Sequence, residues 1–216
     1  MAQTIGVAHD LFAERGYVAV TMDEVAQAVG VTKPLLYNYF GNKELLFLAC
    51  LEQAAQQLES TVLAAIAATS SPEEALRDGL RAYFAFVAED PQTWRVLYDE
   101  AVPAESEIGR RVAEHRGRIT ALVASTVSGQ LPASKGDRAQ IEVEALSTAL
   151  LGAAESLAHW WLGTEAIPAP EAAELLIATV EPGLTQRRGP HRPTRAPRTA
   201  HRAPRTESSK RTRTQN

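Results

Sequence analysis

Apolar residues recur three and four positions apart through most of the sequence, whereas runs that alternate apolar and polar residues between turns are missing. The first spacing lines one face of an α-helix, and the second would line one face of a β-strand. The pattern therefore predicts an all-α protein of about nine helices.

The first 40 residues predict three short helices. An apolar stripe that ends at Gly16 predicts the first helix, and Thr21 opens a capping box that begins the second. Gly30 supplies the turn that follows the second helix, because glycine adopts left-handed backbone angles without strain. Thr32 then caps a third helix that contains residues 33–40. Three helices joined by such short turns predict a helix-turn-helix.

Later helices are longer and begin at clear capping sequences. Asn42 opens a fourth helix whose apolar positions continue for several turns. Ser71 and Asp90 are each followed by a proline, which combines a capping side chain with a residue suited to the first helical position. The remaining predictions are helices at about 106–128 and about 137–162, and a short helix from about Pro170 that ends before Pro182.

The third predicted helix has two distinct faces. Leu36 and Phe40 share one face, which we expect to pack on the first two helices. Pro34, Leu35 and Asn38 lie on the opposite face, which we expect to enter the major groove of DNA. The two apolar residues of that face can contact thymine methyl groups.

The polar residues of this segment have separate predicted roles. Asn38 can form two hydrogen bonds with an adenine edge, and Lys33 can reach guanine acceptors. Tyr37 and Tyr39 flank the base-reading face, where their hydroxyls can reach phosphate oxygens. Lys43, at the start of the next helix, can also contact a phosphate. The full predicted DNA-binding set is Thr21, Thr32, Lys33, Pro34, Leu35, Tyr37, Asn38, Tyr39 and Lys43. The alternative is that the tyrosines are half-buried packing residues and the lysines are only solvated.

The stretch LFAERGYVAVTMDEVAQAVGVTKPLLYNYFGNKELL, Leu11 to Leu46, resembles the DNA-binding domain of the TetR (tetracycline repressor) family. The likeness covers about 45 residues and includes the end of the first helix, the capped second helix and the third helix. The resemblance implies a homodimer, usually a repressor, that binds a double-stranded DNA operator. It also implies a larger helical C-terminal domain that binds a small-molecule effector and dimerises through its last two long helices.

The sequence departs from this family pattern in its charge. Members commonly carry an arginine near the start of the first helix, where this chain has Ala2, Gln3 and Thr4, so we expect an N-terminal phosphate anchor to be missing. Residues 1–46 hold three basic and five acidic side chains, a net charge of −2. Because phosphate contacts supply most nonspecific affinity, we expect that affinity to be weak and sensitive to salt.

Basic residues are concentrated at the C-terminal end. Of the 22 lysines and arginines, ten lie in residues 183–216, where Glu207 is the only acid, which leaves 12 basic and 25 acidic side chains in residues 1–182. The tail is rich in Arg, Pro and Thr and holds little apolar material, so we expect it to be disordered. Its charges could contact DNA phosphates or could form only a solvated extension, and the sequence leaves both open.

These features predict three parts of the chain: a helix-turn-helix DNA-binding domain at 1–46, an effector-binding and dimerisation domain at 47–182, and the basic tail at 183–216. Small residues on the eighth helix would let two backbones come close, although packing within one protomer would use them equally well. The predicted dimer interface contains Leu146, Ala149, Leu150, Gly152, Ala153, Ser156 and Leu157.

The effector site is predicted from aromatic and isolated polar residues in the C-terminal domain, although such residues are often ordinary core. The candidates are Tyr83, Phe86, Trp94, Tyr98, His115 and Trp160. His115, Glu155 and His159 match no metal-ligand spacing, so no metal or cofactor is predicted. The single cysteine, Cys50, is expected to be a buried apolar residue and not a redox sensor.

The sequence therefore predicts a ligand-responsive transcriptional regulator, most simply a repressor that a small-molecule effector releases from a palindromic operator. An enzyme is disfavoured, because no nucleophile–base pair or glycine-rich phosphate loop is present. A third interpretation is a helical interaction or ligand-binding module whose DNA binding has weakened. The absence of a secretory signal or an apolar span predicts a cytoplasmic protein without a membrane partner.

Overall fold

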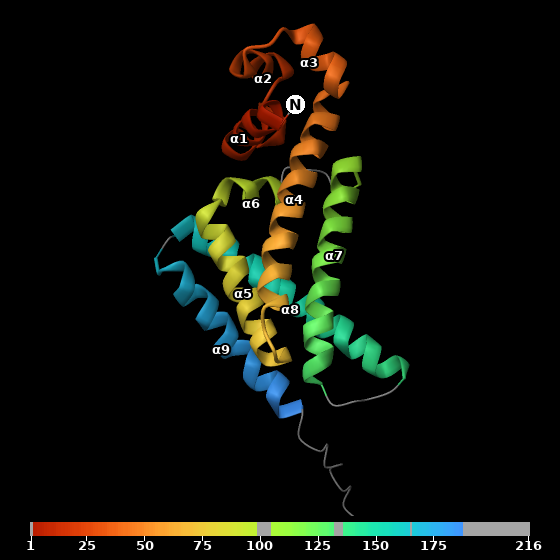
Figure 1. Cartoon of the computed structure of the whole chain (residues 1–216), viewed down its shortest axis with the longest axis vertical. Helices are drawn as coiled ribbons and strands as arrows, with labels where there is room; N and C mark the ends of the chain where they lie inside the picture. The colour runs from red at the N-terminus through yellow and green to blue at the C-terminus, as the bar shows by residue number, and fades with distance from the viewer. Residues whose placement is uncertain (1, 99–104, 132–135, 165, 188–216) are drawn as a thin grey trace, which may run out of the picture.

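A computed structural model describes residues 2–98, 105–131, 136–164 and 166–187. Within these ranges the chain forms nine helices and no strand, which confirms the all-α prediction (Figure 1). The helices are α1 (Ala2–Ala19), α2 (Met22–Val29), α3 (Lys33–Phe40), α4 (Lys43–Ala67), α5 (Pro72–Glu89), α6 (Pro91–Leu97), α7 (Glu107–Gln130), α8 (Asp137–Thr164) and α9 (Ala169–Arg187).

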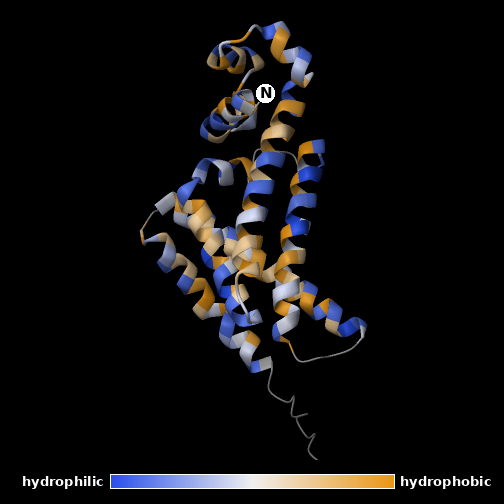
Figure 2. Ribbon diagram, viewed as in Figure 1, coloured by the Kyte–Doolittle hydropathy of each residue, from blue (hydrophilic) through white to orange (hydrophobic). Residues whose placement is uncertain are grey.

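The helices α1 to α3 form one end of an elongated molecule, and α4 runs from that end into the middle of the rest (Figure 1). In the remainder, α5 packs on α4 and α9, while α7 packs on α8. The part of α5 beside α4 is mainly hydrophobic, whereas the end of α7 nearest α1 to α3 is mainly hydrophilic (Figure 2). None of the described helices is long and apolar enough to cross a membrane.

Local capping chemistry sets the ends of α2 as predicted. Thr21 and Glu24 form a complete capping box, in which each side chain bonds the backbone N–H of the other residue. Val20 and Val25 on either side of this box are fully buried, in the positions of a hydrophobic staple. Gly30 ends α2 at φ 78° and ψ 30°, the left-handed conformation that favours glycine.

An aromatic cluster joins the first helix to the fourth. Phe47 of α4 is fully buried, with its ring centroid 5.0 Å from that of Phe12 in an edge-to-face arrangement and 4.9 Å from that of Tyr17. Gly16 interrupts α1 between the two partners with φ 76° and ψ 160°. The cluster therefore fixes both segments of α1 against the long helix that enters the C-terminal part.

The last helix differs from the prediction. The sequence pattern predicts an end before Pro182, but α9 continues through that proline to Arg187. Proline removes only one backbone donor here, and Leu184 beyond it is buried in the core, which favours continuation of the helix. Residues 183–187 therefore belong to α9. The predictions of disorder and DNA contact for residues 188–216 lie outside the described residues.

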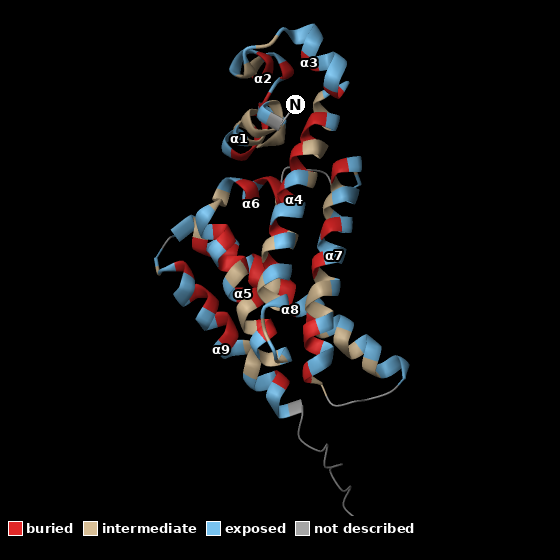
Figure 3. Ribbon diagram, viewed as in Figure 1, coloured by how far each residue is buried: buried red, intermediate tan, exposed pale blue. Residues whose placement is uncertain are grey.

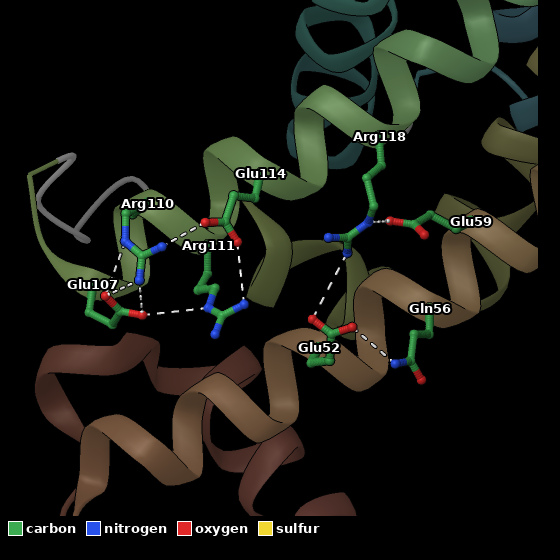
Figure 4. Close-up of polar contacts among 8 residues, drawn as sticks. All are labelled: Glu52, Gln56, Glu59, Glu107, Arg110, Arg111, Glu114 and Arg118. Carbon is green, nitrogen blue, oxygen red and sulfur yellow. Dashed lines mark hydrogen bonds and ion pairs between the residues drawn. The ribbon is translucent and has the colours of Figure 1, made fainter.

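Ion pairs and hydrogen bonds connect α4 with α7 (Figure 4). Arg118 Nε donates to Glu59 Oε1 at 2.7 Å, and Arg118 Nη2 lies 3.9 Å from Glu52 Oε2. The same Glu59 oxygen lies 2.8 Å from Nδ1 of His115, whose Nε2 is buried without a hydrogen-bond partner among the described residues. Exposed pairs of this kind contribute little individually, but the buried imidazole responds to pH.

We expect His115 to destabilise the fold as the pH falls. Burial lowers the pKa of His115, although Glu59 opposes the shift. The unfolded chain therefore takes up a proton near the ordinary histidine pKa of 6.5, whereas the folded chain takes it up only at a lower pH. The free energy of unfolding therefore falls as the pH drops below about 6.5, and His115 leaves it unaffected above that pH. Urea denaturation from about pH 7.5 to about pH 5.5 measures the slope of the free energy of unfolding against pH.

The slope should shrink in His115→Gln. His159→Gln, which removes an exposed imidazole from α8, is the comparison variant. Equal pH slopes for wild type and His115→Gln would contradict the assignment.

Candidate nucleic-acid interface and ligand cavity

The helix α3 has one buried and one exposed face, as the helical spacing predicts (Figure 3). Leu36 and Phe40 are 1% and 8% exposed and pack into the core of the α1–α4 end. Pro34, Leu35 and Asn38 are all exposed on the opposite side. The orientation of the helix is therefore confirmed, while the base contacts of these residues stay predictions.

Lys33 is held by an acid of the neighbouring helix. Its Nζ atom lies 2.8 and 2.9 Å from the two carboxylate oxygens of Asp23 in α2 and 5.9 Å from the ring centroid of Tyr37. The hydrogen bond with Asp23 raises the pKa of Lys33. A base contact by Lys33 requires this pair to open, which costs little because both side chains are exposed to water.

Lys43 turns towards the end of α1. Its Nζ donates to the carbonyl oxygen of Val18 at 3.1 Å and lies 4.5 Å from the ring centroid of Tyr17, and partial burial lowers its pKa. Arg15 pairs with Glu24 at 2.9 Å. Together with the ion pair of Lys33 and Asp23, these contacts give each basic side chain of residues 2–46 a partner in the folded chain. The sequence did not predict these pairings.

The two threonines of the predicted DNA-binding set differ in whether their hydroxyl groups are already hydrogen-bonded. The Thr21 hydroxyl donates to Glu24 Oε2 at 2.8 Å and accepts from the Glu24 backbone N–H at 3.3 Å. The hydrogen bonds that the Thr21 hydroxyl and the Thr21 backbone N–H donate to the Glu24 carboxylate, followed by that of Arg15, lower the pKa of Glu24 to about 2. Thr32 is exposed at the start of α3 and makes no capping hydrogen bond with its side chain. Thr32 is therefore the better placed of the two to meet a phosphate.

We expect Asp23→Asn to strengthen DNA binding. The change frees Lys33 and removes one negative charge beside α3. The loss of one negative charge next to the DNA changes the charge balance by as much as one added phosphate contact, which steepens the salt dependence by about 0.9 and corresponds to about fivefold in affinity at 0.15 M salt. Anisotropy titrations at several salt concentrations measure both quantities. Glu144→Gln makes the same charge change on α8 and should leave the affinity unaltered, and an equal gain in the two variants would contradict a local role.

A cavity of about 400 Å³ lies between α6, α7 and α8. Trp94 and Tyr98 stack in its wall with ring centroids 4.6 Å apart, and the Trp94 Nε1–H donates to the Tyr83 hydroxyl at 2.8 Å. The volume falls within the range typical of small-molecule sites. The lining residues are Trp94, Leu97, Tyr98, Val112, Arg116, Glu155, Ser156 and His159.

Glu155 is the acid of this cavity. Its Oε2 lies 2.5 Å from Nη2 of Arg116, while its Oε1 is buried without a hydrogen-bond partner in the described part of the chain. Burial raises the pKa of Glu155, and Arg116 together with the nearby Tyr98 hydroxyl opposes the shift. The Tyr98 hydroxyl acts on the carboxylate as a hydrogen-bond donor, whereas Oε1 itself has no partner among the described residues.

A second cavity of about 390 Å³ lies between α1, α6 and α8. It shares Trp94, Tyr98 and His159 with the first cavity, and its α1 wall includes Phe12 and Gly16. Helices α1 and α6 are also joined where the Thr93 hydroxyl lies 3.0 Å from Nε2 of His9. A ligand that moves the shared wall therefore acts on residues that contact the helix-turn-helix end.

The predicted effector residues are only partly brought together. Trp94 and Tyr98 line the 400 Å³ cavity, and Tyr83 supports Trp94 from a small apolar cavity of about 40 Å³. Phe86 and His115 are buried outside these cavities, and Trp160 is 46% exposed and lines none of them. Arg116 was not predicted from the sequence, and Glu155 and His159 were considered there only as metal ligands.

The signal that could have identified Glu155 was an acid inside the apolar stretch 145–163. The described residues contain no group of three or more potential metal ligands.

The predicted dimer residues all lie along α8 but differ in how far they are exposed. Ala149 and Ser156 are exposed. Leu150 is 6% exposed and lines the small apolar cavity inside the protomer. The partly exposed members are Leu146, Gly152, Ala153 and Leu157. The interface itself stays a prediction.

Two sequence families match the chain. "Bacterial regulatory proteins, tetR family" matches residues 5–50, and "Tetracyclin repressor-like, C-terminal domain" matches residues 72–181, which is more than half of the sequence. The chain belongs to the TetR family. As a TetR-family protein it is a helix-turn-helix transcriptional regulator, and the resemblance noted from residues 11–46 is confirmed.

Individual TetR-family proteins are similar to this chain in sequence or in structure. The HTH-type transcriptional activator FasR of Mycolicibacterium smegmatis is 29% identical over 76% of this chain and 72% of its own length. The crystal structure of a TetR-like regulator from Rhodococcus sp. RHA1 is 29% identical, with a TM-score of 0.71 over 85% of this chain and 94% of that one. AibR in complex with isovaleryl coenzyme A and operator DNA shares the fold, at 20% identity and a TM-score of 0.67 over 82% and 95% of the two chains.

Proposed function

We propose that this TetR-family regulator binds a palindromic DNA operator as a homodimer and leaves it when a small molecule occupies the cavity between α6, α7 and α8. The observation that carries the proposal is the orientation of α3. Its exposed side presents Pro34, Leu35 and Asn38 together, while Leu36 and Phe40 anchor the opposite side in the core. An exposed second helix of a helix-turn-helix is the element that enters the major groove.

The effector part of the proposal is supported by the position of the cavity. Trp94 and Tyr98 belong both to the 400 Å³ cavity and to the cavity that α1 closes. A ligand that prefers one arrangement of this wall shifts the population of orientations of the helix-turn-helix end, and only such a preference can couple the two sites. AibR, which shares the fold, was crystallised with both an acyl coenzyme A and operator DNA.

A homodimer is supported by the geometry of DNA and by the outer face of α8. Two recognition helices must enter the major groove about one turn, or about 34–36 Å, apart, which a two-fold dimer achieves. The small residues Ala149, Gly152 and Ala153 leave room for a second helix on the side of α8 that retains exposure.

The sign of regulation follows from where the operator lies. A dimer bound across a promoter excludes polymerase, so we propose repression for an operator in that position. FasR is named an activator, which shows that a relative works in the other direction. The remaining alternative, a ligand-binding module with weakened DNA binding, draws on the pairing of Arg15, Lys33 and Lys43 within the folded chain.

DNase I footprinting on the DNA that flanks the chain's own gene tests this proposal. We expect one protected region with a two-fold repeat and a stoichiometry of two protomers, or a multiple of two. The protection should disappear in Tyr37→Ala, which removes an exposed side chain beside the base-reading face. Absence of protection at low salt on every flanking fragment would favour the ligand-binding alternative.

A further inference from the structure

One carboxylate oxygen of Glu155 in the effector cavity lacks a donor. Glu155 is 8% exposed, and its Oε1 has no hydrogen-bond partner among the described residues, although its Oε2 is paired with Arg116. A buried acceptor without a donor destabilises the folded chain, and more so when it is charged. Because Glu155 lines the cavity, a rotation of its carboxylate can bring this acceptor to a donor of a bound molecule.

Several donors near Glu155 are already engaged. The Trp94 Nε1–H bonds the Tyr83 hydroxyl, and the nearest Arg116 nitrogen bonds the other oxygen of Glu155. The Tyr98 hydroxyl is committed to the Glu155 carboxylate as well, yet Oε1 still has no partner among the described residues. Rotation about the last side-chain bond of a glutamate is broad, so either oxygen can turn to the ligand while the other keeps Arg116.

The charge of the cavity restricts the donor further. Arg116 already balances Glu155, so no second cation is needed in this wall. A ligand carboxylate at the same place would lie beside the Glu155 carboxylate, which repels it. The stacked pair of Trp94 and Tyr98 offers a flat wall that suits an aromatic or other planar apolar body.

We propose that the cavity binds a flat, largely apolar molecule whose uncharged hydroxyl or N–H group donates a hydrogen bond to Glu155, and that it rejects a carboxylate at this position. The assignment rests on the proposed function only in treating this molecule as the effector. The binding itself is a property of the chain without DNA.

Four probes of similar size test the assignment by calorimetric titration of the full chain in the absence of DNA. They are 2-naphthol, 2-methoxynaphthalene, 2-naphthoate and 2-naphthylmethylammonium, which differ only in the group that meets Glu155. We expect 2-naphthol to bind at least about tenfold more tightly than each of the other three, because only it supplies an uncharged donor.

Variants of Glu155 separate the hydrogen bond to the ligand donor from the rejection of a ligand carboxylate. Glu155→Met should reduce the preference for 2-naphthol over 2-methoxynaphthalene to about twofold or less, because the acceptor is gone. Glu155→Gln keeps an acceptor without the charge, so it should keep that preference but bind 2-naphthoate more tightly than the wild type does. Glu144→Met, on an exposed position of α8, is the matched control and should behave as wild type. Circular dichroism checks that each variant is folded.

The results that overturn the assignment are specific. They are equal binding of 2-naphthol and 2-methoxynaphthalene by the wild type, tighter binding of the carboxylate or the ammonium, an unchanged preference in Glu155→Met, or no binding of any probe at millimolar concentration. If Glu155→Met does not fold, Glu155→Gln decides through its response to 2-naphthoate. A chain that binds these probes as expected but fails to bind DNA would refute the proposed function and leave this assignment standing.

Discussion

Replacing Phe47 with alanine is expected to lower the free energy of unfolding by about 3–5 kcal/mol, the usual loss for a fully buried phenylalanine. Phe47 has no exposed surface and contacts the rings of Phe12 and Tyr17 from the first turns of α4. The alanine leaves a cavity at the junction through which α1 is fixed to α4. Urea denaturation of the full chain, followed by far-UV circular dichroism, measures the change.

A conservative replacement at the same position is the control. Phe47→Leu keeps most of the apolar volume and should cost less than about 1.5 kcal/mol if the neighbouring rings repack. A loss below about 1 kcal/mol for Phe47→Ala would show that the aromatic cluster contributes no more than an average substitution site. In that case α1 would have to be held to α4 by its other contacts.

Replacing Asn38 with alanine is expected to weaken operator binding by about 1–3 kcal/mol, the discrimination of one bidentate contact to a base. Asn38 is exposed on α3, so its removal should leave stability unchanged. Because the amide is expected to read a base and not a phosphate, binding to a scrambled duplex should be the same for both proteins. Competition anisotropy with operator and scrambled DNA separates the two affinities.

Gln57→Ala is the matched control for this variant. Gln57 is an exposed amide on α4, away from α3, and should bind operator as the wild type does. An equal loss on operator and scrambled DNA in Asn38→Ala would assign Asn38 to the phosphate backbone. No loss on operator would remove it from the interface.

The starts of α2 and α5 were predictable because their signals are local. The capping box of Thr21 and Glu24 and the proline that follows Ser71 act within a few residues, and α2 and α5 begin where these signals stand. The two faces of α3 were equally predictable, since the helical period alone places Leu36 and Phe40 together. Local chemistry thus determined the position and orientation of the candidate DNA-reading helix.

Contacts between distant residues could not be predicted in the same way. Lys33 meets Asp23 across the turn of the helix-turn-helix, and the Lys43 ammonium reaches a carbonyl 25 positions earlier in the chain. The pair of Glu155 with Arg116 joins two long helices that no sequence spacing relates. These pairings exist only after the helices pack, and they determine which charges remain available to a ligand.

The burial of Leu150 on α8 and the late end of α9 have a related cause. Helix α8 is apolar on two sides, so the sequence period could not separate Leu150, which faces the protomer interior, from Ala149, which is exposed. Pro182 predicted the end of α9, but the burial of Leu184 outweighed that local signal. Tertiary packing decides both cases, because the free energy gained by burying apolar surface exceeds the local conformational preference.

DNA binding by the exposed face of α3 is the basis of the proposed function. It is tested most directly by an anisotropy titration of the full chain with labelled DNA that flanks its own gene, at about 0.05 and 0.2 M salt. We expect saturable binding that weakens at the higher salt and that unlabelled scrambled DNA does not compete away. Failure to bind any flanking fragment at the lower salt, in a chain that circular dichroism shows to be folded, would contradict it.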